Sequence, residues 1–165
     1  NIMIIIVKKK GLLKIKNLSL KCTLGRGGVK KNKKEGDKAT PKGIFSLGFL
    51  YYRDDRIRNL KSNLKKKKIK RNMGWCNDSN QKKYNSEINL SSNLKGEKLF
   101  RTDHIYDLFI VIKHNFKPVK PGKGSAIFLH LTKNYKPTLG CIAISKVDFI
   151  QLLRIINKKT KIKII

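Results

Sequence analysis

The sequence is short of acidic residues, cysteine, proline and tryptophan. Its 165 residues include 10 Asp and Glu against 40 Lys and Arg, which gives a formal net charge of +30, and there are three cysteines, four prolines and one tryptophan. Three scattered cysteines are too few for a disulfide framework, and the absence of a Cys-x-x-Cys pair argues against a structural zinc site. We expect Cys22 and Cys76 to be small buried apolar residues. A pairing of these two in an oxidising compartment, which would leave Cys141 free, stays open.

Long apolar runs are also missing. The run at the N-terminus, Ile2–Val7, is far too short to cross a bilayer, so no membrane span is expected. Its lysines follow the apolar residues rather than precede them, which is the wrong order for a signal peptide. The chain begins at Asn1 rather than Met, and the removal of an upstream targeting segment stays open.

The positive charge is spread over the whole chain, together with many Ile and Asn residues, as a biased genome would produce. We therefore interpret it as a broadly basic surface that affects solubility and nonspecific binding. The densest basic run, residues 65–71, is expected to be a solvated loop. A nonspecific contact with a polyanion is the alternative for its lysines, Lys65, Lys66, Lys67 and Lys68.

Apolar patterning indicates a mainly β fold in one domain, residues 1–165, which is long enough to bury a core. Thr40-Pro41-Lys42-Gly43 leads into one strand, with Gly43 permitting an unusual backbone turn. Ser145 and Asp148 have capping-box spacing ahead of an apolar run with period 3–4, which predicts one amphipathic helix over 146–157. Residues 53–97 are the least periodic, and Gly74–Asp78 with Tyr84-Asn85 suits an ordered loop. The expected strands are 2–7, 18–24, 44–52, 108–113, 125–131, 141–144 and 161–165.

His130 lies in the apolar run 126–131 and is a candidate for chemistry. Alternate residues of a strand share a face, so Ile127, Leu129 and Leu131 point to the core and His130 points to the opposite face beside Phe128. We expect a half-buried imidazole there, which needs a polar partner.

Cys141 follows Gly140 at the start of the next apolar run, and a nine-residue turn separates the two expected strands. A thiol beside an imidazole is the minimum equipment for cysteine-based acyl transfer, because the imidazole can take and return the thiol proton. Gly140 allows a close approach of substrate, and the amide of Cys141 or its neighbour is a candidate for stabilising an oxyanion. Thr138 is a candidate donor to the substrate or to the histidine.

These residues carry a resemblance to a known family. Thr40-Pro41-Lys42-Gly43-Ile44-Phe45 and Thr138-Leu139-Gly140-Cys141-Ile142 resemble the early T-P-x-G-x-F and late S/T-x-G-C motifs of bacterial L,D-transpeptidase catalytic domains of the YkuD type. The resemblance extends from about Leu24 to Leu153. Further segments resemble one branch of that family: Glu35-Gly36-Asp37, Gly74–Asp78, Arg101–Asp107 and Gly124–His130.

The resemblance implies a β-sandwich-like catalytic domain with Cys141 as nucleophile and His130 as general base. It implies that the cysteine attacks a peptidoglycan stem peptide between an L-configured centre of a diamino acid and a terminal D-residue. A thioester forms, and an amine of a second stem or water resolves it. No metal or organic cofactor is implied. The cell envelope or periplasm is the implied location, and we expect a monomer.

The sequence departs from the family pattern at three places. Leu139 stands where the family commonly has a second His, Leu131 where it often has Gly, and Ala143 where it often has Arg. The acceptor reaction therefore stays open between cross-linking, exchange of D-amino acids and hydrolysis. Arg101 is a candidate to bind a substrate carboxylate, with a structural ion pair as the alternative.

His104 and His114 are expected to be surface or loop residues. Two competing functions remain. One is a basic module that binds nucleic acid or another polyanion, whose affinity would fall steeply with salt and be indifferent to Cys141. The other is a noncatalytic domain that binds the cell wall.

Overall fold

The structure is a computed structural model that describes residues 1–91 and 93–165. Its largest sheet runs in the order β13-β12-β11-β6-β14-β1-β2-β3, with β7 added to β6. The bounds of these strands are Ile4–Lys8 (β1), Leu12–Ile15 (β2), Leu18–Lys21 (β3), Gly43–Tyr52 (β6), Lys66–Lys68 (β7), Leu108–Ile112 (β11), Phe128–Leu131 (β12), Ile142–Ile144 (β13) and Lys161–Ile164 (β14). The expectation of a mainly β fold is confirmed.

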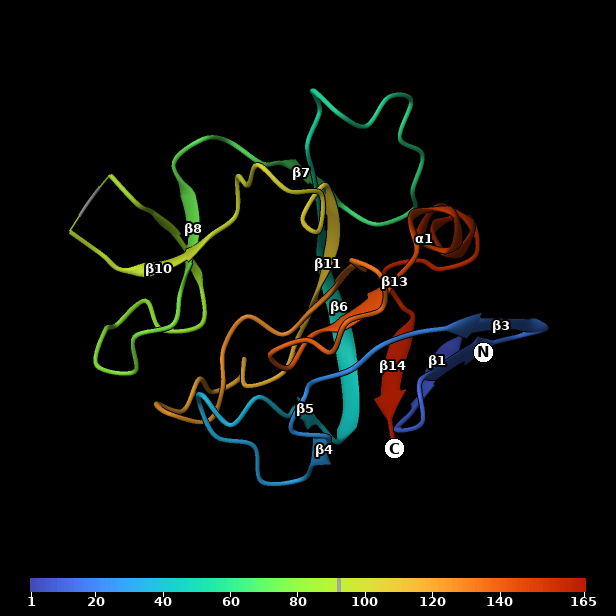
Figure 1. Cartoon of the computed structure of the whole chain (residues 1–165), viewed down its shortest axis with the longest axis horizontal. Helices are drawn as coiled ribbons and strands as arrows, with labels where there is room; N and C mark the ends of the chain where they lie inside the picture. The colour runs from blue at the N-terminus through green and yellow to red at the C-terminus, as the bar shows by residue number, and fades with distance from the viewer. Residues whose placement is uncertain (92) are drawn as a thin grey trace.

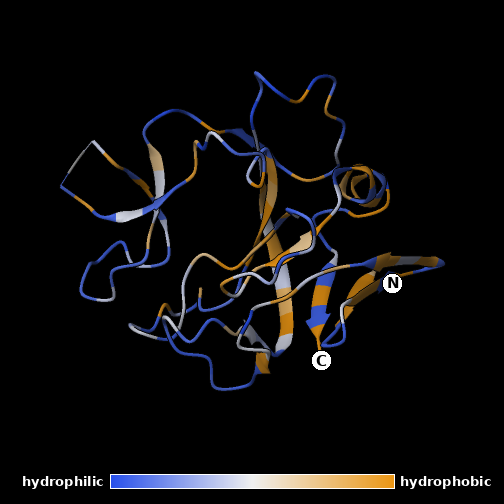
Figure 2. Cartoon of the chain, in the orientation of Figure 1, coloured by the Kyte–Doolittle hydropathy of each residue, from blue (hydrophilic) through white to orange (hydrophobic). Residues whose placement is uncertain are grey.

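The two ends of the chain meet near the middle of this sheet. Strand β14 lies between β6, to which it is antiparallel, and β1, to which it is parallel. It alternates Lys and Ile, and the banding of β14 in Figure 2 shows that alternation. Ile162 and Ile164 are buried while Lys163 is exposed, because successive side chains of a strand point to opposite faces.

The large sheet curls until its two edges touch. Thr23, two residues beyond β3, exchanges backbone hydrogen bonds with Ala143 of β13 at 2.9 and 3.0 Å. Thr138 N–H likewise donates to Leu24 O at 3.0 Å. The turn before β13 is thereby tied to the N-terminal hairpin.

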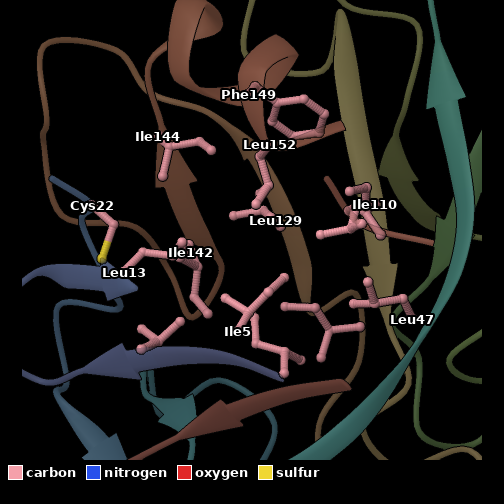
Figure 3. Packing of buried hydrophobic residues seen from close by; sticks show 14 of the residues in the cluster. Ile5, Leu13, Cys22, Leu47, Ile110, Leu129, Ile142, Ile144, Phe149 and Leu152 are labelled. Carbon is pink, nitrogen blue, oxygen red and sulfur yellow. The ribbon is translucent and has the colours of Figure 1, made fainter. Parts of the chain in front are cut away.

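The inside of the curled sheet holds the main apolar core. Figure 3 shows Ile5, Leu13, Leu47, Ile110, Leu129 and Ile142 converging there. Helix α1, Lys146–Leu153, covers this core with Phe149, Leu152 and Leu153, each worth roughly 1.5–3 kcal/mol when fully buried. Ser145 caps the helix by accepting a hydrogen bond from Asp148 N–H at 3.1 Å, so the expected start of the helix is confirmed.

The outer face of β6, β11 and β12 carries a second, aromatic cluster that includes Tyr51, Phe109 and Phe128. It is covered by a small sheet of β10 (Gly96–Lys98), β8 (Met73–Cys76) and β9 (Glu87–Asn89), which lies apart from the large sheet in Figure 1. The Trp75 ring of β8 meets the Phe128 ring edge-on, with 5.1 Å between centroids. A side chain on this face therefore becomes buried between two sheets.

A short two-stranded sheet leads into β6. It pairs β4, Val29–Lys30, with β5, Thr40–Pro41. Gly43 follows with φ +147°, a conformation that L side chains rarely adopt. The expected unusual turn at this glycine is confirmed.

Three expectations about local structure are wrong. The lysine run is not all loop, because Lys66–Lys68 forms β7 along β6, although its side chains are exposed as expected. Met73–Cys76 is a strand rather than a loop, since Gly74 and Trp75 pair with β10 on one side and with β9 on the other. The helix ends at Leu153 instead of residue 157, because Arg154 N–H already bonds the carbonyl of Gln151, three residues back.

No helix within residues 1–91 and 93–165 has the length and apolar character needed to span a membrane.

Candidate active site

Strand β12 places His130 as its alternation predicts. Ile127, Leu129 and Leu131 belong to the inner core, whereas Phe128 belongs to the outer aromatic cluster. The imidazole lies on that outer face, edge-on to the Tyr106 ring at 5.4 Å between centroids. It is 6% exposed, so the expectation of a half-buried ring is wrong, because Tyr106 covers it.

The hydrogen bond of His130 fixes its tautomer. Nδ1 lies 2.8 Å from the Leu131 carbonyl oxygen, which can only accept, so Nδ1 carries the proton and Nε2 keeps a free lone pair. Burial lowers the pKa of His130 to about 4. The ring is therefore neutral at physiological pH and can take a proton at Nε2.

Cys141 stands one residue before β13 and is 9% exposed. Its Sγ donates to the Ala126 carbonyl at 3.2 Å and accepts from the Phe128 N–H at 3.3 Å. Burial raises the pKa of this thiol to about 12, with the negative charge of Glu97 adding to the rise and Lys33 opposing it. The resting thiol is protonated.

Strands β12 and β13 are adjacent and parallel, with His130 beside Ala143. Cys141 thus lies two residues back along the neighbouring strand, and both side chains line one cleft of about 700 Å³. In the part of the chain that is described, the thiol bonds to the backbone of Ala126 and Phe128 rather than to the imidazole.

Thr138 and Gly140 shape the turn that presents Cys141. Thr138 Oγ1 donates to the Cys141 carbonyl at 2.5 Å and accepts from the Gly140 N–H at 3.1 Å. Gly140 has φ +139°, and a Cβ there would lie 2.9 Å from the Ala39 carbonyl oxygen. Only glycine fits this position without strain.

Arg101 lines the cleft but is already paired. Its Nε and Nη2 donate to the Asp103 carboxylate at 2.9 and 2.6 Å, and this hydrogen-bonded pair lowers the pKa of Asp103. Both side chains are about one-third exposed. The ion pair that the sequence analysis gave as the alternative for Arg101 is therefore present, and it lies in the lining of the cleft.

Three cleft residues escaped the sequence reasoning: Lys33, Glu97 and Tyr106. Lys33 is buried and its Nζ bonds Asp37 at 2.8 Å, which gives a structural role to the Glu35-Gly36-Asp37 segment. Tyr106 Oη donates a short hydrogen bond to Glu97 Oε1. All three lie in segments without apolar periodicity. The only indication of them in the sequence was the resemblance of Glu35-Gly36-Asp37 and Arg101–Asp107 to one branch of the family, because these segments contain Tyr106 or lie close to Lys33 and Glu97.

The aromatic and amide residues of the middle region hold the backbone that faces the thiol. Asn85 Oδ1 accepts from Trp75 Nε1 at 3.0 Å and from Ala126 N–H at 3.1 Å. Ala126 has φ +54°, an uncommon conformation for a residue with a Cβ. Its carbonyl is the acceptor of the Cys141 thiol, so Asn85 positions this thiol through one backbone residue.

The remaining cysteines and histidines lie elsewhere. Cys22 and Cys76 are buried as expected, and all three cysteines are free. His104 is exposed and bonds Asp107 at 2.7 Å. His114 is in a loop after β11 but is half-buried. The described residues contain no cluster of three or more His, Cys, Asp or Glu side chains that could hold a metal ion.

Comparison with known proteins agrees with this geometry. The family described as the L,D-transpeptidase catalytic domain (YkuD) matches residues 3–164. No curated protein matches. Among solved structures, the helical cell shape determining protein Pgp2 from Campylobacter jejuni has a TM-score of 0.52 at 17% identity, covering 99% of this chain and 47% of that one; its K307A mutant gives the same values.

An L,D-transpeptidase from Mycobacterium smegmatis has a TM-score of 0.48 at 11% identity, over 99% of this chain and 58% of that one. The Pgp2 similarity is one of fold. The present chain spans about half the length of the Pgp2 structures.

Proposed function

Since the chain belongs to the family of L,D-transpeptidase catalytic domains, we propose that it catalyses acyl transfer on peptidoglycan stem peptides, with Cys141 as nucleophile and His130 as base. The observation that carries the proposal is the opening of one thiol and one neutral imidazole into a single cleft. This substrate implies that the protein acts in the cell envelope and remodels the cell wall. We propose that it acts as a monomer.

The first half-reaction forms a thioester. A stem peptide in the cleft presents the carbonyl between its diamino acid and its terminal D-residue to Cys141. The thiol turns from the Ala126 carbonyl toward His130, and Nε2 takes the proton as sulfur bonds to the carbon. The C–N bond then breaks, and His130 returns the proton to the departing amine of the D-residue.

The second half-reaction releases the acyl group. An amine or a water molecule bonds to the thioester carbon, the C–S bond breaks, and the proton of the attacking group passes through His130 to the Cys141 sulfur. Thr138 and Gly140 act by holding the turn that presents the sulfur. Arg101 is proposed to attract a carboxylate of the stem peptide to the cleft mouth.

The proposal is tested by mass spectrometry of the reduced, folded protein after incubation with a carbapenem or a tetrapeptide stem. We expect one adduct, located on Cys141, and release of the terminal D-residue from muropeptides. Buried Cys22, which does not line the cleft, is the internal control thiol. If Cys141 stays unmodified and no D-residue is released, the proposal is wrong.

The base is tested separately with His130→Ala. This variant should keep its circular dichroism spectrum and lose most of the acylation rate, because general base catalysis typically contributes 10²–10⁴-fold. An unchanged rate would exclude His130 as the base. Binding to nucleic acid that falls steeply with salt, without any adduct on Cys141, would instead support the basic binding module.

A further inference from the structure

Within residues 1–91 and 93–165 the carboxylate of Glu97 forms no ion pair, in a chain that has four times as many basic as acidic residues. Across the described residues, the lysine and arginine side chains that form ion pairs do so with other carboxylates, among them Asp37, Asp103 and Glu87. Buried or half-buried carboxylates are normally paired, because removing a charge from water is costly. An unpaired carboxylate beside a nucleophile therefore points to a cation that arrives with the substrate.

Glu87 provides an internal comparison. Both Glu87 and Glu97 lie directly opposite Trp75, on the two strands that flank β8, so all three side chains share one face of the small sheet. Each glutamate accepts a hydrogen bond from a tyrosine, Tyr51 to Glu87 at 2.6 Å and Tyr106 to Glu97. Only Glu87 also binds a lysine, Lys67, at 2.8 Å.

The surroundings of Glu97 leave one of its carboxyl oxygens available. Burial raises its pKa, while the Tyr106 hydroxyl and the charge of Arg101 favour the carboxylate and the charge of Glu35 opposes it. Arg101 is itself held by two hydrogen bonds to Asp103. The Tyr106 bond occupies Oε1, and Oε2 has no partner within residues 1–91 and 93–165.

The charge of Glu97 works against the first half-reaction, because it raises the pKa of the Cys141 thiol. The carboxylate of Glu97 hinders formation of the Cys141 thiolate. It is useful only later, when the sulfur is bound in an uncharged thioester and an amine must enter the cleft. Amines reach the cleft as ammonium ions, for which a carboxylate is the matching partner.

We propose that Glu97 binds the ammonium group of the acyl acceptor beside the Cys141 thioester, and so favours amines over water. This inference rests on the acyl transfer proposed above. The first proton of the ammonium passes to Glu97 and on to water, and the nitrogen bonds to the thioester carbon. The C–S bond breaks, and the second proton of the nitrogen passes through His130 to the sulfur.

The test compares Glu97→Gln with the matched control Glu87→Gln. Glutamine keeps the size of the side chain and an acceptor for Tyr106 but removes the charge. The acyl-enzyme is formed with a tetrapeptide stem and resolved by three nucleophiles: a tripeptide stem bearing a side-chain amine, hydroxylamine, which is uncharged at neutral pH, and water.

We expect Glu97→Gln to slow resolution by the tripeptide about tenfold or more, since a hydrogen bond to a charged group is worth about 1.5–3 kcal/mol. Resolution by hydroxylamine and water should stay within about twofold, and Glu87→Gln should match the wild type with all three. An equal loss with every nucleophile, or no selective loss with the tripeptide, would overturn the role of Glu97.

A binding measurement separates this inference from the proposed function. Calorimetry with Cys141→Ala protein and the tripeptide alone requires no chemistry. Adding Glu97→Gln should weaken binding about tenfold, and adding Glu87→Gln should leave it unchanged. If Cys141 is not acylated but Glu97→Gln still weakens tripeptide binding selectively, the proposed reaction is rejected and the ammonium site is retained. If Glu97→Gln leaves tripeptide binding unchanged, the ammonium site is rejected.

Discussion

Replacing Asn85 with alanine should destabilise the protein by about 5 kcal/mol. The side-chain amide accepts from Trp75 Nε1 and Ala126 N–H and donates to the carbonyls of His114 and Asn115. Alanine leaves the two donors buried without partners, at about 2 kcal/mol each. Water can replace the amide at the two carbonyls, whose residues are half-buried. The left-handed φ of +58° at position 85 adds about 1 kcal/mol for alanine.

The loss is measured by urea unfolding, followed through the fluorescence of Trp75, the single tryptophan. Asn85→Gly removes the same hydrogen bonds but accepts the positive φ, so it should be about 1 kcal/mol more stable than the alanine variant. Asn80→Ala, on an exposed loop residue, is the control and should stay within about 0.5 kcal/mol of the wild type. A loss below about 1 kcal/mol for Asn85→Ala would refute the assignment of its hydrogen bonds.

Three further predictions follow from single side chains. Burial alone would raise the pKa of Asp37, but hydrogen bonds from Lys33 and two backbone amides lower it to about 2. The ionised carboxylate therefore stabilises the folded protein by about 2 kcal/mol above pH 4, and this contribution is lost as the pH falls toward 2. Acid unfolding of Asp37→Asn should lack this component. Because the pKa of His130 is about 4, the rate of Cys141 acylation by a carbapenem should show no protonation step between pH 5 and 8 and should fall only near pH 4; a step near pH 6.5 would contradict the burial of the ring. Thr138→Val should reduce that acylation rate about tenfold and lower the free energy of unfolding by about 1–3 kcal/mol, because it removes both Oγ1 hydrogen bonds, while Thr138→Ser should retain rate and stability; equal rates for both variants would show that these hydrogen bonds are dispensable.

Much of the frame of the site could be predicted from local patterns. The alternation of residues 126–131 placed His130 on the face opposite the core, and the short connection to Cys141 predicted neighbouring strands, both as the structure has them. The capping-box spacing predicted where the helix begins. Each of these depends on the period of a strand or helix, which is encoded within a few residues.

The burial of His130 and the position of Glu97 could not be predicted in this way. Both depend on the small sheet, whose strands are three or four residues long and lie in the least periodic part of the chain. Trp75 packs against residues far away in sequence, and nothing in its local pattern indicates that contact. The place of Lys33 in the cleft could not be predicted either, since its partner Asp37 belongs to a loop and Cys141, which lines the same cleft, lies more than 100 residues away.

The central place of β14 has a consequence for how the protein is made. Residues 161–164 lie between β6 and β1, so on the ribosome the two halves of the sheet lack the strand between them until these residues have left the exit tunnel. Pairing over such long sequence separations is slow and leaves strand edges exposed meanwhile. We therefore expect nascent chains to stay sensitive to proteases until residue 164 has left the ribosome, and then to become resistant in one step.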